Sequence, residues 1–290
     1  MTGVRVTVPA STANLGSGFD ALGMALGLHD VVEFEVVEEG LVVEVSGDYT
    51  DVPTGEDHLV VRAFRAGCEL LDVKVPGLVL RCRNTIPHAR GLGSSSAAVV
   101  AGVAAAFALG GREPDTSALQ LAAEFEGHAD NAAACMFGGV AIAWSKERRF
   151  RSVRVDPHPD VSPVVLVPEQ ESSTRTTRGL LPARVPHEDA AFAAGRSALA
   201  VHALTRDPSL LLDALDDRLH EPYREPAWPA TTRLVAALRA AGVPAAVSGA
   251  GPTALALPPG GVLPEEVDTS GFAVRPVPVD LDGARVAPLG

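Results

Sequence analysis

The sequence predicts an α+β protein built from two domains. Strand-like and helix-like segments are mixed in both halves of the chain, without the steady strand–helix alternation of a parallel sheet. The 290 residues suit two moderate domains, and a hydrophobic content of 47% is ample for a core. A charged, proline-containing stretch at 145–163 marks the boundary. We therefore expect an N-terminal domain over 1–155 and a C-terminal domain over 156–290.

Charge and cysteine content exclude several classes of protein. The formal net charge of −12 disfavours a nucleic-acid partner or an anionic membrane surface. The three cysteines, Cys68, Cys82 and Cys135, show no CxxC spacing, which indicates free, buried thiols in a reducing compartment. No signal peptide is visible, and the longest apolar run, 97–109, is too short to cross a bilayer. We expect a cytoplasmic protein; its oligomeric state is left open, with a homodimer as one option.

Alternating residues predict the elements of the first domain. Strands are expected over 4–8, 29–37, 41–45, 78–83 and 140–144. The Glu-Glu-Gly turn at 38–40 predicts that the second and third of these strands form a hairpin. Asp57 is expected to cap a helix over 58–71, and Asp115 or Thr116 a helix that ends near Glu126. Residues 10–20 form a polar loop after Pro9.

The stretch 86–96 organises the domain. Pro87, Gly91 and Gly93 exclude regular structure there, while the apolar helix formers that follow, up to a glycine pair at 110–111, predict a buried helix. This helix begins with three serines. A helix N-terminus carries unpaired N–H groups and a partial positive charge, so it suits a phosphate group. From these residues alone, an ordinary helix cap is an equally good interpretation.

The second domain is also expected to contain both strands and helices. Strands are expected over 164–167, 244–247, 253–257 and 272–277, and helices over 188–205, 208–215 and 230–241. Common nucleotide motifs fail: no Walker lysine follows the glycines, and the GxGxxA match at 249–254 does not open a helix.

Three stretches resemble the signatures of the GHMP small-molecule kinases. Residues 87–96 resemble the phosphate-binding signature, 248–253 the C-terminal glycine motif, and 9–20 the N-terminal substrate motif. Within that superfamily the chain resembles the homoserine kinases. The likeness lies in 11–20, in the HxDN box at 126–131, in the STxxxR…LP segment at 173–182 and in the D…EPYR segment at 217–224.

The resemblance implies a fold and an activity. The fold is an N-terminal domain like ribosomal protein S5 domain 2, followed by a ferredoxin-like domain, with the site between them. The activity is the ATP-dependent transfer of a phosphoryl group to the hydroxyl of L-homoserine, on the route to threonine. His58 departs from the asparagine that usually helps to hold adenine in this family, which questions that contact.

The resemblance also implies site residues. For the nucleotide phosphates these are Pro87, Arg90, Gly91, Leu92, Gly93, Ser94, Ser95 and Ser96. Arg90 is expected to supply charge in place of the missing lysine, and Ser95 and Glu124 to hold Mg²⁺. For the zwitterionic substrate the residues are Asn14, Asp20, His128, Asn131, Arg178 and Arg224.

Each substrate-binding residue has an expected role. Asp20 is expected to receive the ammonium group, and Arg178 with Arg224 to clamp the carboxylate, since charge-assisted contacts suit both ends of the substrate. The remaining residues, which are Asn14, His128 and Asn131, are expected to position the amino group and the hydroxyl. Asn131, Asp20 and Arg178 are expected to take part in catalysis. Asp130 and Asp20 are candidates for a general base, but none is assigned, because Asn131 cannot accept a proton at neutral pH.

Three rival functions are weighed. Another GHMP kinase, for mevalonate or a sugar, would need a different substrate clamp. A non-catalytic, S5-like RNA-binding module would need a basic face, which the net charge disfavours. A nicotinamide oxidoreductase would rest on Gly249 and Gly251 alone.

Overall fold

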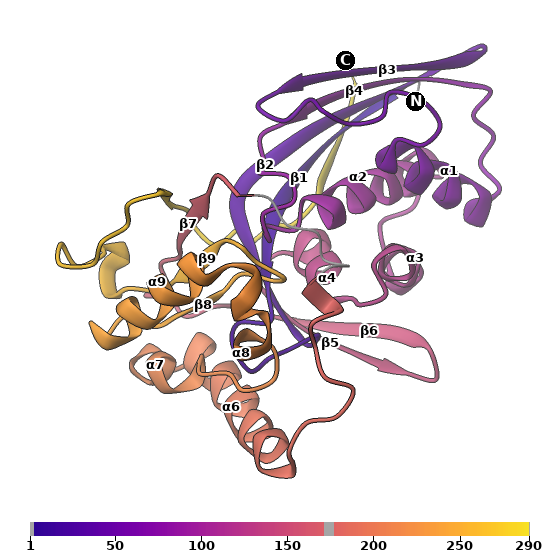
Figure 1. The fold of residues 1–290 in the computed structure, drawn as a ribbon. Coiled ribbons are helices and arrows are strands. Elements are labelled where there is room, and N and C mark those ends of the chain that lie inside the picture. The colour runs from indigo at the N-terminus through magenta and orange to yellow at the C-terminus, as the bar shows by residue number, and fades with distance from the viewer. Residues whose placement is uncertain (1–2, 171–176, 290) are drawn as a thin grey trace.

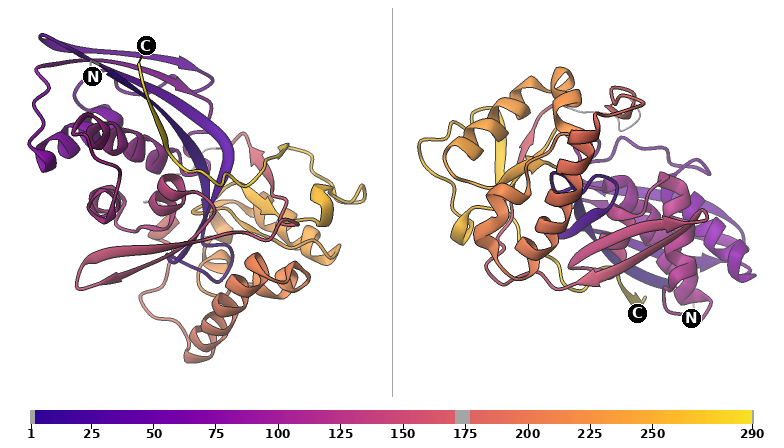
Figure 2. Two further views of the ribbon diagram at one scale, coloured as in Figure 1. Left: turned by 180° about the vertical axis from the view of Figure 1, so that it is seen from behind. Right: turned by 90° about the horizontal axis from the view of Figure 1, so that it is seen from below.

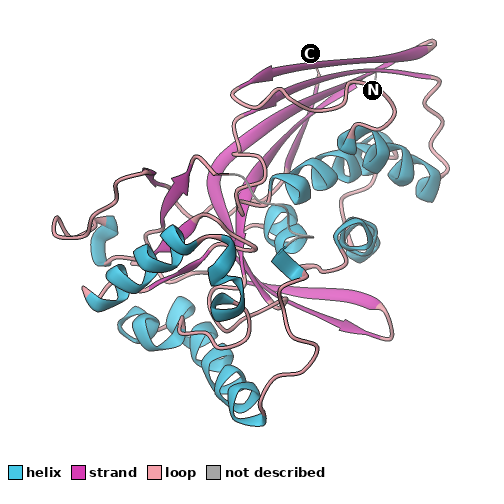
Figure 3. Ribbon diagram, viewed as in Figure 1, coloured by secondary structure: helices cyan, strands magenta, loops and turns pink. Residues whose placement is uncertain are grey.

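A computed structural model describes residues 3–170 and 177–289 as two sheets with associated helices (Figures 1 and 3). The predicted α+β architecture is confirmed: a seven-stranded sheet carries helices on one face, and a four-stranded sheet lies beside it with its own helices. Within the described residues, no helix is both long and apolar enough to cross a lipid bilayer.

The large sheet is organised around one long strand. The strands are β1 Gly3–Ala13, β2 Leu22–Val37, β3 Gly40–Gly47, β4 Gly77–Asn84, β5 Val140–Lys146, β6 Arg149–Val155 and β11 Arg285–Pro288. Their main path is β11-β1-β2-β4-β3, and β5 pairs with the first residues of β2 and with β6. The strand expected over 4–8 continues to Ala13, because a bulge between Pro9 and Ala10 accommodates the proline without ending the ladder.

The predicted hairpin at 29–45 is wrong. Strand β3 pairs in parallel with β4, so β4 lies between β2 and β3. Burial explains this order: β4 buries Leu78, Leu80 and Cys82, whereas the residues of β3 are all exposed or half-exposed. The more apolar strand therefore occupies the inner position, and the more exposed β3 becomes the edge.

Four helices cover one face of this sheet: α1 Leu59–Leu71, α2 Ser94–Leu109, α3 Thr116–Glu126 and α4 Asp130–Phe137. Helix α2 is central, and eleven of its residues are buried, from Ser96 to Phe107. It begins at the three serines and ends at Gly110, as predicted. Asp115 caps α3 by accepting from the N–H groups of Ser117 and Ala118. The cap of α1 is His58, not Asp57, and it makes no side-chain capping bond.

The small sheet has the order β10-β7-β9-β8, antiparallel throughout. Its strands are β7 Val164–Pro168, β8 Ala245–Val247, β9 Ala254–Ala256 and β10 Phe272–Pro276. The helices of this part are α6 His187–Thr205, α7 Leu211–Ala214, α8 Glu221–Arg224 and α9 Pro229–Ala240. Numbered within the sheet, the order is 4-1-3-2, which is that of a ferredoxin-like domain, but a short 3₁₀ turn, Pro259–Gly261, precedes the last strand where a second helix would stand.

The end of the chain returns to the large sheet. Strand β11 pairs with β1, which brings the two termini close together (Figure 2). Asp280, whose side chain is 6% exposed, stabilises the segment that leads back to the large sheet. Its carboxylate accepts from His29 at 2.6 Å, from the Gly283 N–H at 2.7 Å and from Arg285 at 3.1 Å. Burial alone would raise the pKa of Asp280, but these hydrogen bonds outweigh it and lower the pKa to about 2.

This anchor predicts a pH-dependent stability. A carboxylate whose pKa falls from 3.8 to about 2 on folding stabilises the protein above pH 4, and the contribution is lost as the pH falls toward 2. Asp280→Asn should lower the free energy of unfolding by about 2 kcal/mol at pH 7, with the difference shrinking below pH 4. Urea unfolding at several pH values measures this. Asp282→Asn, a change at an exposed carboxylate of the same segment, should cost less than about 0.5 kcal/mol; equal losses would contradict the assignment.

Candidate functional site

A cavity of about 430 Å³ contains most of the residues that the sequence singled out. It is bounded by the loop before α2, by the loop after β1, by the HxDN box and by residues of the second half of the chain. Its volume lies in the range of small-molecule sites. The residues that line it include Asn14, Asp20, His58, Arg90, Gly91, Gly93, Ser94, Ser95, Ser96, Glu126, His128, Asp130, Asn131, Arg178 and Arg224.

Three segments that are distant in sequence meet at one wall of this cavity. The Ser11 N–H donates to Leu92 O at 3.0 Å, and the Gly249 N–H donates to Ala13 O at 3.0 Å. The Ser248 hydroxyl lies 2.6 Å from Gly91 O. The end of β1, the phosphate-loop candidate (residues 86–96) and the C-terminal glycine motif (residues 248–253) are therefore joined to one another by hydrogen bonds, which hold all three in a defined arrangement.

The N-terminus of α2 opens into the cavity. Its cap is Gly93 with φ +68°, and within the described residues no side chain caps the helix. The N–H groups of Ser94, Ser95 and Ser96 therefore remain available, together with the positive end of the helix dipole. A Cβ at Gly91, where φ is +77°, would collide with Ser248 O, so glycine is required for the close approach of the loops.

Arg90 is placed differently from the expectation. Its guanidinium donates to Pro168 O at 3.1 Å, to His88 O at 3.0 Å and to Glu169 O at 2.8 Å. These bonds tie the loop to the end of β7 in the small sheet. The Arg90 side chain therefore joins the two sheets while it also lines the cavity.

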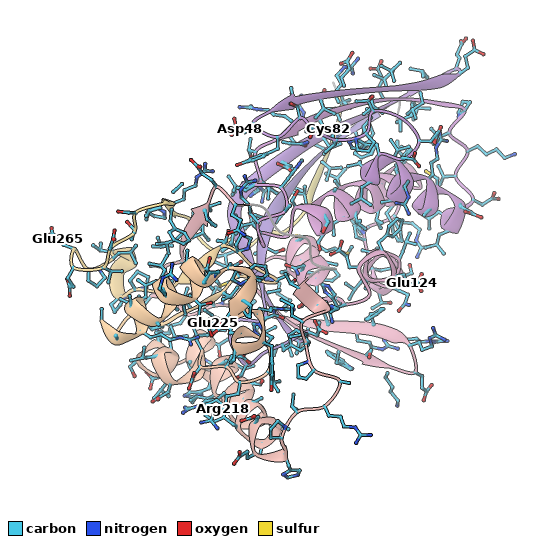
Figure 4. All side chains as sticks on the ribbon, in the orientation of Figure 1. Asp48, Cys82, Glu124, Arg218, Glu225 and Glu265 are labelled. Atoms are coloured by element: carbon cyan, nitrogen blue, oxygen red, sulfur yellow. The ribbon has the colours of Figure 1, made fainter. Side chains whose placement is uncertain are left out.

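The carboxylate beside the phosphate-loop candidate is Glu126. It lies 2.9 Å from the Ser96 hydroxyl and lines the cavity. Glu124, the residue expected to hold the metal, is exposed, accepts from Gln120 at 2.7 Å and lies on the outside of α3 (Figure 4). Two residues along a helix correspond to about 200° of rotation, so the two carboxylates face opposite ways. The Glu126 carboxylate and the serine hydroxyls are oxygen donors of the kind that Mg²⁺ prefers.

Asp20 and Arg178, which also line the cavity, form a two-pronged ion pair with both N–O distances at 2.8 Å. Burial alone would raise the pKa of Asp20, but the hydrogen bonds and charge of Arg178 outweigh it and lower the pKa. The guanidinium of Arg178 also lies over the Phe19 ring, at 5.5 Å from its centre. Residues 173–176 of the STxxxR segment lie outside the described part of the chain.

Arg224 lies beside this pair but is only partly satisfied. It is 1% exposed, and one terminal nitrogen is shared between Gly249 O at 3.2 Å and His220 Nδ1 at 3.1 Å. Its Nε is buried and has no partner among the described residues. Burial, followed by repulsion from Arg178, lowers the pKa of Arg224 to about 10, so it stays protonated at neutral pH. A buried cation with an unused donor favours an anionic ligand.

His128 and Asp130 form a second charged pair in the lining of the cavity. His128 Nδ1 lies 2.6 Å from Asp130 Oδ1, which also accepts from the Asn131 N–H at 2.8 Å. Burial would lower the pKa of His128, but the hydrogen bond and charge of Asp130 outweigh it and raise the pKa. Ligand atoms of Asp20, His128 and Asp130 lie within 4.8 Å of one another. We call these three residues the acidic cluster, and its two carboxylates can accept from a cationic group.

Asn14 acts as a clamp between two of the loops. Its Nδ2 donates to Gly249 O at 2.7 Å, and its Oδ1 accepts from the Asp20 N–H at 3.1 Å. Both ends of the amide are thus used within the protein, so Asn14 sets the position of Asp20.

Sequence reasoning missed Glu126 as a site residue, although it opens the HxDN box that was recognised. It also missed His220, which stacks on Phe19 and bonds Gly16 O at 3.0 Å, because its position depends on the packing of the second domain. His58, which stands where the family usually has an asparagine, lines the cavity. Its buried Nδ1 has no partner within the described residues.

Comparisons with known proteins place the chain in a family. The family model for the GHMP kinases N terminal domain matches residues 58–139, and the one for GHMP kinases C terminal matches 198–267. The homoserine kinase of Streptomyces coelicolor is 49% identical, over 99% of this chain and 95% of its own; that of Rhodococcus erythropolis is 48% identical, over 99% and 93%.

Solved structures give the same result. The crystal structure of homoserine kinase from Cytophaga hutchinsonii aligns with a TM-score of 0.85 at 26% identity, covering 99% of this chain and 98% of that one. The predicted fold is therefore confirmed over the length of the chain. With an open helix N-terminus and a charged clamp in one cavity, and with these relatives, the chain belongs to the homoserine kinase family of the GHMP kinases.

Proposed function

We propose that this protein is an ATP-dependent kinase that transfers the γ-phosphoryl group to the side-chain hydroxyl of L-homoserine. The product, O-phospho-L-homoserine, lies on the route to threonine. One observation carries the proposal: the open N-terminus of α2 and the partly satisfied Arg224 line the same cavity, beside the acidic cluster. A nucleoside triphosphate and a small zwitterion can therefore be held side by side.

The phosphates bind to the N-terminus of α2. The N–H groups of residues 94–96 and the helix dipole stabilise their negative charge, which does the work that a lysine does in other phosphate loops. Ser95, whose side chain is exposed at the cavity, and the Glu126 carboxylate are the groups that would hold Mg²⁺. When bound, the ion neutralises charge on the β- and γ-phosphates.

The charged side chains of the cavity bind the amino acid. Its carboxylate takes the guanidinium groups of Arg224 and Arg178, and its ammonium group takes Asp20. The substrate therefore separates the Asp20–Arg178 pair and replaces each half with a group of the same charge. Both ions keep a partner throughout, which limits the desolvation cost of binding.

Catalysis follows from orientation. Asn131 stands between the phosphate-loop candidate and the acidic cluster, and it positions the attacking hydroxyl. An amide does not accept a proton, and His128 and Asp130 are paired with each other. The hydroxyl proton therefore leaves late, to solvent or to the transferred group, and the barrier is lowered by positioning and charge stabilisation.

The experiment is an assay of ADP release with ATP and Mg²⁺ over homoserine, serine, threonine and mevalonate. We expect kcat/KM to be highest for homoserine, by at least tenfold, because only homoserine combines both charged groups with a hydroxyl at the right distance. A preference for mevalonate would support the rival GHMP kinase instead. Absence of ADP release with every substrate would refute the proposal.

Arg224 gives a prediction about substrate affinity. Arg224→Met removes a charge-assisted contact of about 1.5–3 kcal/mol, so KM for homoserine should rise about tenfold to a hundredfold while KM for ATP changes less than threefold. Arg218→Met is the matched control, since this exposed arginine of the same segment lies outside the cavity (Figure 4). An equal rise of KM in both variants would contradict the role of Arg224.

Glu126 and Glu124 make a matched pair for the metal. Glu126→Gln keeps an acceptor for Ser96 but removes a charge, so the Mg²⁺ concentration for half-maximal activity should rise about tenfold or more. Glu124→Gln should change it less than twofold, because that carboxylate faces away. Steady-state rates over a Mg²⁺ series decide between them, and the reverse pattern would restore Glu124 as the ligand.

A further inference from the structure

Ser11 lies behind the cavity wall, where the phosphate-loop candidate and the HxDN box come together. It is fully buried near the end of β1. Its N–H donates to Leu92 O at 3.0 Å, and its hydroxyl lies 2.8 Å from Asn131 Oδ1. A Cβ at Gly93 would collide with this hydroxyl, so the loop passes directly against it. One side chain thus contacts both halves of the site.

The hydrogen bond to Asn131 has a defined direction. Oδ1 of an amide can only accept, so the Ser11 O–H donates to it. Cys135, which is fully buried one turn further along α4, has its sulfur 3.3 Å from the Ser11 oxygen and 3.2 Å from Pro9 O, and its S–H can donate to either oxygen. A thiol sulfur is a weaker acceptor for the serine proton than an amide oxygen. The serine proton is therefore directed at Asn131.

This bond determines which end of the amide faces the reactants. With Oδ1 held by Ser11, the Nδ2 group is the free end, and Asn131 lines the cavity. Among the described residues no protein group accepts from Nδ2. An NH₂ donor is therefore presented where a phosphoryl oxygen and a hydroxyl would meet. With the amide reversed, the Ser11 oxygen would accept from Nδ2, and the serine proton would have no oxygen acceptor among the hydrogen bonds of the described residues, which favours the orientation with the NH₂ group toward the cavity.

We propose that Ser11 is a positioning residue for phosphoryl transfer: it fixes the Asn131 amide with its NH₂ group toward the reactants and ties it to the phosphate-loop candidate. The proposal rests on the proposed function, and it adds a residue that does not itself touch the substrate. Ser11 is expected to affect kcat more than KM, because the amide donor acts on the oxygens whose charge changes in the transition state.

The test is a double-mutant cycle on kcat, with Ser11→Ala, Asn131→Ala and the double variant. We expect Asn131→Ala to lower kcat about a hundredfold and Ser11→Ala about tenfold, with KM for both substrates changed less than threefold. In the double variant, kcat should equal that of Asn131→Ala within about twofold. Thr12→Val is the matched control: it removes a neighbouring, fully buried hydroxyl that bonds Ser248, and kcat should stay within threefold of the parent.

Multiplicative losses in the double variant, or an unchanged kcat in Ser11→Ala, would overturn the proposal. An unchanged kcat in Asn131→Ala would instead remove the catalytic role of Asn131 from the proposed function, and this inference with it. If Ser11→Ala does not fold, Ser11→Cys replaces it. This weaker donor should give a smaller loss of kcat that is again absent in the Asn131→Ala background.

Discussion

The structure depends on a set of hydrogen bonds that join the end of β1 and two glycine loops around an uncapped helix end. Ser11, Gly91 and Gly249 stand in three segments that are far apart in sequence, and their backbone groups are bonded within this junction. Because the loops satisfy one another, none of them has to cap α2. The N–H groups at the start of that helix therefore stay available for a ligand, on a rigid element buried in the core.

The charged side chains that line the cavity are arranged in pairs. Asp20 is paired with Arg178 and Asp130 with His128, whereas Arg224 retains a buried donor without a partner in the described part of the chain. Two satisfied pairs beside one unsatisfied cation can receive a zwitterion by exchange of partners, with no new charge buried alone. The clamp at Asn14 and the stacking of His220 on Phe19 connect this arrangement to both domains.

Much of this could be predicted from the sequence. The glycine–serine loop, the helix that begins at Ser94 and the clustering of Asp20 with both arginines follow from local residue chemistry and from likeness to a family. Strand pairing could not be obtained in this way. The turn at 38–40 is compatible with a hairpin, and only the competition for the inner sheet position gives that place to β4.

The direction of individual side chains is the second feature that could not be predicted from the sequence. Glu124 and Glu126 are equivalent in a list of acidic residues, and only the helix geometry shows which one faces the cavity. Arg90 has the right charge in the right loop, but its reach to the carbonyls at the end of β7 depends on how the two sheets pack. Ser11 carries no sequence signal for its contact with Asn131, since the two residues are 120 positions apart.

The most direct measurement of the central claim is a crystal structure of the protein with Mg²⁺, a non-hydrolysable ATP analogue and homoserine. The account predicts the β- and γ-phosphates within hydrogen-bond distance of the N–H groups of residues 94–96, and the substrate carboxylate on Arg224. A nucleotide bound elsewhere, or phosphates that do not touch the start of α2, would contradict it.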